Sequence, residues 1–65
     1  MSKVIQFDRN GETGNIFYII GQARKVLHKQ GRVKESHQMF ARVNKAHSFD
    51  EALEVIGEYV ELEEM

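Results

Sequence analysis

Hydrophobic and polar residues alternate over residues 3–8, where Ile5 and Phe7 lie two positions apart among polar neighbours. Alternation with a period of two is the pattern of a β-strand that buries one face. Two glycines and several turn-forming side chains follow directly, so the strand is predicted to end there. Asn15 or Thr13 can then cap a helix, because both carry a side-chain oxygen that accepts a backbone N–H.

Residues 16–30 have a helical period, with apolar residues three and four positions apart: Ile16, Ile20, Ala23 and Leu27. Gly31 is predicted to end this helix. Three further apolar residues lie off the stripe: Phe17, Ile19 and Val26. The helix is therefore expected to be covered from two directions. Gly21 weakens a helix by about 1 kcal/mol relative to alanine, so it is expected where another backbone comes close; a merely tolerated glycine is the alternative.

A second helix is predicted over residues 33–45, with its apolar side formed by Val33, Phe40 and Val43, and Met39 beside them. A third helix is predicted to begin at Ser48, because Ser48 and Glu51 have the spacing of a capping box. Its apolar residues follow at helical spacing: Phe49, Ala52, Leu53, Ile56 and Val60.

After Gly57 the pattern changes to alternation, so residues 60–63 could continue the helix or form a short strand. We favour a strand that pairs with residues 4–7, because an isolated N-terminal strand would leave its backbone without hydrogen-bonding partners. The predicted fold class is α+β, with an N-terminal strand, three helices and a short C-terminal strand.

The chain has 65 residues and no cysteine, which indicates a single domain over residues 1–65 with a thin core and no disulfide or thiolate metal site. The absence of cysteine and of any long apolar run favours a cytoplasmic protein. Small domains gain stability by association. Because Phe17 and Ile19 extend the apolar surface of the first helix, we expect a homodimer.

The net charge is only −1, but the charges are segregated along the chain. Residues 22–47 hold seven basic residues and one acid, whereas residues 48–65 hold seven acids and no lysine or arginine. The two segments are complementary, so the acidic segment is expected to pack back on the body of the protein and could cover the basic one.

No residue pattern indicates an enzyme. His28, His37 and His47 lie nine and ten residues apart, which does not place two imidazoles on adjacent helical turns as a zinc pair requires. No nucleophile, Walker or dinucleotide-binding motif is present, so no catalytic residue, metal or cofactor is predicted. The loop over residues 11–16 precedes a helix and could hold an anion or a small ligand, although an ordinary strand-to-helix turn is the favoured interpretation.

The basic segment is the strongest candidate for a functional surface, and four of its residues are predicted to contact a partner: Arg24, Lys25, Lys29 and Arg32. A protein partner is the first interpretation. Nucleic-acid binding through residues 24–45 is the alternative, and no membrane partner is expected. Against nucleic acid, no aromatic residue lies between Tyr18 and Phe40, whereas single-strand binding uses aromatic stacking.

Several short motifs carry a family resemblance: Phe7-Asp8, Gly11, Gly14-Asn15-Ile16-Phe17 and Ser48-Phe49-Asp50-Glu51-Ala52-Leu53. In these motifs the chain resembles a set of small uncharacterised proteins of bacteriophages and bacterial mobile elements. The resemblance covers both ends of the chain, and residues 31–47 depart from it. It implies an origin but no activity or ligand. The sequence thus predicts a non-enzymatic accessory or regulatory protein that binds a host or phage macromolecule.

Overall fold

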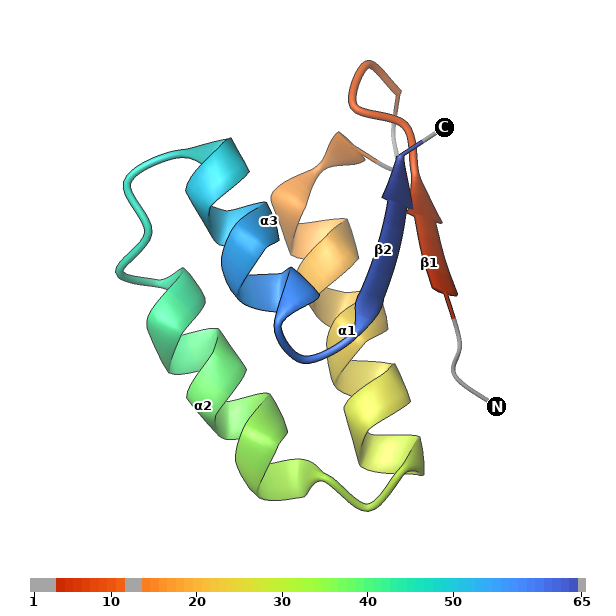
Figure 1. Cartoon of the computed structure of the whole chain (residues 1–65), viewed down its shortest axis with the longest axis vertical. Coiled ribbons are helices and arrows are strands. Elements are labelled where there is room, and N and C mark those ends of the chain that lie inside the picture. Colours follow the sequence, from red (N-terminus) through yellow and green to blue (C-terminus); the bar gives the residue numbers. More distant parts are fainter. Residues whose placement is uncertain (1–3, 12–13, 65) are drawn as a thin grey trace.

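The computed structural model describes residues 4–11 and 14–64. Along the described chain the elements are β1 (Val4–Phe7), α1 (Ile16–Lys29), α2 (Val33–Val43), α3 (Phe49–Gly57) and β2 (Glu61–Glu64). Figure 1 shows the helices on one side of the molecule and the two strands, side by side, on the other. The predicted α+β class, with a strand at each end and three helices between them, is confirmed for the described residues.

The two strands pair in parallel, and the register places Val4 opposite Glu61 and Phe7 opposite Glu64. The predicted C-terminal strand is therefore confirmed, but it begins one residue late. The reason is that the N–H of Val60 still donates to the carbonyl of Ile56, 3.1 Å away, so Val60 belongs to the turn that ends α3.

Local chemistry fixes both ends of α1. The side chain of Asn15 accepts a hydrogen bond from the N–H of Phe17 at 2.8 Å, which confirms it as the cap. Thr13, the alternative cap, lies outside the described residues. Gly31 has a φ of 74°, the left-handed conformation that glycine adopts without strain, and α1 ends before it as predicted.

Helix α1 lies at the centre of the core, since it contacts α2, α3 and β1. This arrangement confirms that it is covered from two directions. Ile19 and Val26, which lie off the predicted stripe, are both buried for that reason, whereas Phe17 is 76% exposed. The buried apolar core comprises Ile5, Phe7, Ile19, Ile20, Ala23, Val26, Leu27, Met39, Val43, Ala52, Ile56 and Val60.

Helix α2 buries Met39 and Val43 of the predicted apolar side, but Ser36 takes the place of Val33 and Phe40 in the core. Its buried residues are Ser36, Met39 and Val43. Val33 and Phe40 lie at the edge of this stripe and are 44% and 38% exposed. Apolarity alone did not identify Ser36 as a core position. This small residue and the flexible Met39 fill the space beside the neighbouring helices.

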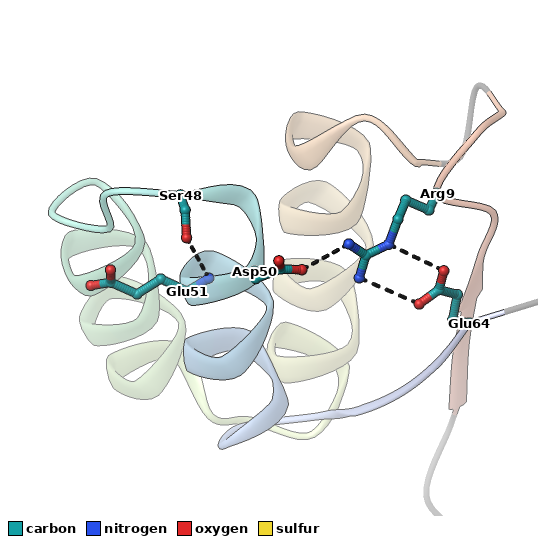
Figure 2. Close-up of polar contacts among 5 residues, drawn as sticks. All are labelled: Arg9, Ser48, Asp50, Glu51 and Glu64. Carbon is teal, nitrogen blue, oxygen red and sulfur yellow. Dashed lines mark hydrogen bonds and ion pairs between the residues drawn. The ribbon is translucent and has the colours of Figure 1, made fainter.

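Helix α3 begins as predicted, since the Ser48 Oγ accepts a hydrogen bond from the N–H of Glu51 at 3.1 Å (Figure 2). The second half of the capping box differs from the expected form. The Glu51 carboxylate accepts from the N–H of His47 at 3.3 Å, one residue before the cap. Ala52 and Ile56 of α3 are buried against the core, which confirms that the acidic segment packs on the body of the protein.

The prediction that another backbone segment comes close to Gly21 is wrong. The glycine that lies against another backbone segment is Gly14. A Cβ added at Gly21 would meet nothing within 4 Å, because Gly21 lies on the exposed face of α1. A Cβ at Gly14 would lie 2.4 Å from the carbonyl oxygen of Asp8, in the turn that leaves β1. Among the described residues, no helix is long and apolar enough to cross a membrane.

Candidate binding surface

The outer face of α1 carries a row of exposed basic residues. We call this surface the basic face and define it by Arg24, Lys25, His28 and Lys29, which are all exposed. They lie on two successive helical turns, opposite the residues of α1 that are buried in the core. The helix therefore holds these four side chains at fixed spacing and directs them to solvent.

Two cations of the basic face have no acidic partner among the described residues, namely Arg24 and Lys25. Arg24 instead lies over the ring of Phe40 from α2, with its guanidinium carbon 5.2 Å from the ring centroid. This cation–π contact leaves the charge of the guanidinium uncompensated. Lys29 shares the face and takes part in a further interaction within the protein.

Arg32 does not join the basic face, although the sequence grouped it with the other three. It follows the turn at Gly31, is half-buried and directly precedes α2. Its guanidinium donates to the side chains of Glu35 and of Gln30, the latter at 2.9 Å. The charge of Arg32 is therefore compensated locally by Glu35, at an i,i+3 spacing that helices favour.

The acidic segment forms ion pairs elsewhere. Figure 2 shows Arg9 between two carboxylates, with its Nη1 2.8 Å from Asp50 and its Nε 3.1 Å from Glu64. Arg9 thus connects the turn after β1, the start of α3 and the end of β2. The hydrogen bond to Asp50 raises the pKa of Arg9 most, and the hydrogen bond to Glu64 raises it further. No sequence pattern indicated this contact, because the partners of Arg9 are 41 and 55 residues away.

A second pair joins the basic and acidic segments. Arg42 of α2 donates to both carboxylate oxygens of Glu58, at 2.8 and 3.0 Å, and also to the Tyr59 hydroxyl at 3.2 Å. The hydrogen bonds to Glu58 and Tyr59 raise the pKa of Arg42, and the same bonds from Arg42 lower the pKa of Glu58. The acidic segment therefore compensates Arg42, but it leaves Arg24 and Lys25 uncovered.

The charges that are segregated in sequence are also segregated in space. Asp50, Glu51, Glu54 and Glu58 are exposed along α3 and its end, opposite the buried Ala52 and Ile56. Helices α1 and α3 turn their apolar faces to the same core, so their charged faces both point away from it. The exposed face of α1 is thus basic and that of α3 is acidic.

Aromatic side chains flank the basic face, an arrangement that the sequence spacing concealed. Phe17 and Tyr18 precede it on α1 and are 76% and 41% exposed. Phe40 is distant in sequence but reaches Arg24 from α2. Between the aromatic residues and the cations, Gly21 leaves the helix backbone open to solvent. The surface therefore combines cations and aromatic rings.

The other candidate sites gain less from the structure. The described residues contain no group of three or more histidine, cysteine or acidic side chains that could hold a metal ion. The loop over residues 11–16 includes two residues outside the described part, and Asn15 already occupies the N–H of Phe17. An open apolar hollow of about 360 Å³ lies where α1 meets the start of α3, lined by residues that include Phe17, Ile20 and Phe49.

Comparisons with models of protein families, with curated proteins and with solved structures found no significant match to this chain. The resemblance to phage and mobile-element proteins therefore stays a prediction that rests on the motifs alone.

Proposed function

We propose that this chain is a non-enzymatic accessory or regulatory protein, of the phage or mobile-element kind that its motifs resemble, and that it binds a host or phage macromolecule. The basic face of α1 is the contact surface. Its ligand carries excess negative charge, as an acidic protein surface or a nucleic acid does. One observation supports the proposal above all others: Arg24 and Lys25 are exposed and have no acidic partner among the described residues.

The position of these cations suits binding. Helix α1 is 14 residues long and is capped at both ends, so its exposed side chains start from a rigid backbone. A preorganised backbone lowers the entropy lost on association. The exposed acids on α3 lie opposite its buried residues, and they repel an anionic ligand from that part of the surface. Both effects favour one orientation of the ligand on α1.

Retention on heparin tests this proposal, because heparin is a polyanion without bases or amino-acid side chains. We expect the protein to be retained at about 50 mM salt and released as the salt rises. Reversing both charges, in Arg24→Glu with Lys25→Glu, should abolish retention. Both positions are exposed, so circular dichroism should show an unchanged helix content.

The matched control reverses two other exposed lysines, in Lys34→Glu with Lys45→Glu. This variant has the same net charge as the first double variant, but its changes lie on α2 and on the turn that follows it. We expect it to be retained nearly as well as the wild type. Equal loss of retention in both variants would show a response to net charge alone and would contradict a binding face on α1.

A further inference from the structure

We infer that the ligand of the basic face is single-stranded nucleic acid, with bases stacked on Phe17 and Tyr18 and phosphates bound by Arg24 and Lys25. This inference rests on the proposed function, since it names the chemistry of the ligand at the same surface. It is carried by the presence of exposed aromatic rings and uncompensated cations on one face of one helix.

The spacing along α1 repeats. Phe17 and Arg24 are seven residues apart, and so are Tyr18 and Lys25. Seven residues make nearly two helical turns, so each aromatic ring lies in line with its cation, about 10 Å away along the axis. Two parallel rows result, each with a ring at its start and a cation further along. His28 and Lys29 extend the same rows by one more turn.

Exposure distinguishes these rings from core residues. Phe17 is 76% exposed, the highest value among the large apolar side chains that the structure describes, although five other residues of α1 are buried. An exposed phenylalanine contributes little to folding, but its flat face can stack on any base. Stacking of bases on aromatic side chains tolerates any sequence, because every base has a π-face.

Gly21 makes room for the strand between the rings and the cations. It lies on the exposed face between the two pairs, and a Cβ there would meet nothing within 4 Å. An open hollow on this face is lined by Gly21 together with the four residues of the basic face. A sugar–phosphate backbone that passes from a stacked base to Arg24 or Lys25 can therefore approach the helix closely.

The rings favour nucleic acid over an acidic protein, and a single strand over a duplex. Carboxylates on a protein partner need cations but no exposed stacking surface. In a duplex the bases are already stacked on one another, so rings on a helix surface cannot reach their faces. Only an unpaired strand uses both features of this face.

Fluorescence anisotropy with a labelled single-stranded oligodeoxynucleotide about 12 nucleotides long tests the inference at about 50 mM salt. We expect saturable binding that weakens as salt rises, with a smaller salt dependence in Lys25→Gln because one phosphate contact is lost. Phe17→Ala should weaken binding roughly 5- to 100-fold. Phe17→Leu should weaken it similarly, whereas Phe17→Tyr should bind like the wild type because it retains the ring.

Val4→Ala is the matched control, since Val4 is an apolar residue 45% exposed on β1 rather than on α1, and we expect no change in binding.

Two competitors complete the experiment: the duplex form of the oligonucleotide and polyglutamate. Both should compete much less effectively than the unlabelled single strand. A competitor that matches the single strand would overturn the inference, in favour of a duplex or an acidic protein respectively.

The failure of this inference can be told apart from the failure of the proposed function. If Phe17→Ala binds like the wild type while reversal of Arg24 and Lys25 abolishes binding, stacking is refuted and the basic face stands. If the single strand does not bind but heparin still does, nucleic acid is refuted and an acidic protein takes its place. If the wild type binds neither heparin nor the single strand, both proposals are refuted.

Discussion

The serine side chain has opposite effects on stability at Ser48 and at Ser36. Ser48 caps α3 from an exposed position, where its oxygen accepts a backbone hydrogen bond. Ser36 is completely buried in α2, and its hydroxyl has no hydrogen-bond partner among the described residues. A buried polar group without a partner destabilises the folded state, because it loses its hydrogen bonds to water.

We therefore expect Ser36→Ala to raise the free energy of unfolding by about 1 kcal/mol, since alanine removes the unpaired hydroxyl and favours the helix. Ser48→Ala should lower it by about 1 kcal/mol through loss of the cap. Urea titrations of the two variants and the wild type measure both changes. A loss of stability in Ser36→Ala would show that the hydroxyl has a partner in solution.

Glu58 gives a prediction about pH. Its hydrogen bonds from Arg42 lower its pKa in the folded state, so it contributes stability above the pKa of the unfolded chain. This contribution is lost as the pH falls through the folded-state pKa. The difference in Tm between the wild type and Glu58→Gln should therefore be present near neutral pH and vanish in acid.

The control for Glu58 is Glu54→Gln, because Glu54 is exposed on α3, the helix that Glu58 caps, and has no ion-pair partner among the described residues. Its Tm difference from the wild type should be smaller at neutral pH. Exposed pairs are screened by solvent and salt, so both differences should also shrink at high salt. Equal behaviour of the two variants would show that the pair with Arg42 has no effect on stability.

At the scale of elements, α3 is held to the molecule by apolar burial rather than by charge. Ile56 is completely buried, whereas Leu53 is only partly buried. We expect Ile56→Ala to lower the free energy of unfolding by about 2–5 kcal/mol and Leu53→Ala to lower it by less. Chemical denaturation measures both. Adding about 0.5 M salt should change stability much less than Ile56→Ala, because the surface pairs contribute little.

At the scale of the molecule, the last eighteen residues complete the fold. They supply α3 and β2, and β2 is the strand that pairs with β1. A chain that ends at His47 would lose Ile56 from the core and leave β1 without its partner. We expect its thermal melt to show no cooperative transition. An unchanged midpoint would show that this segment is dispensable and would contradict the architecture described above.

The exposed apolar surface available for the homodimer is smaller than the sequence predicted. Ile19 is completely buried in the protomer, so Phe17 is the exposed residue that remains of the predicted pair. We propose that a second copy covers Phe17 at high concentration in the absence of nucleic acid, so the dimer and the nucleic-acid complex exclude each other at this residue. Sedimentation velocity at tens of micromolar should show a species larger than 7.6 kDa, which Phe17→Ser reduces to the monomer. A single 7.6 kDa species in the wild type would contradict the dimer and leave Phe17 free for nucleic acid.

The sequence by itself determined the order of the elements and most of their ends. Asn15, Gly31 and Ser48 act through hydrogen bonds or a backbone angle within a few residues of themselves. Such features need no tertiary contact, so they could be predicted from the sequence. The pairing of the two strands was also predictable, because an unpaired strand leaves its backbone groups unsatisfied.

Tertiary structure decided which side chains remain for function. Periodicity gives the spacing of a helix face, but not its rotation when apolar residues lie on more than one side. Packing against elements distant in sequence buried Ile19 and left Phe17 and Phe40 exposed. It also placed Phe40 beside Arg24, whose guanidinium has no acidic partner in the described part of the chain. The candidate site therefore combines cations visible in the sequence with aromatic neighbours whose positions depend on how the core packs.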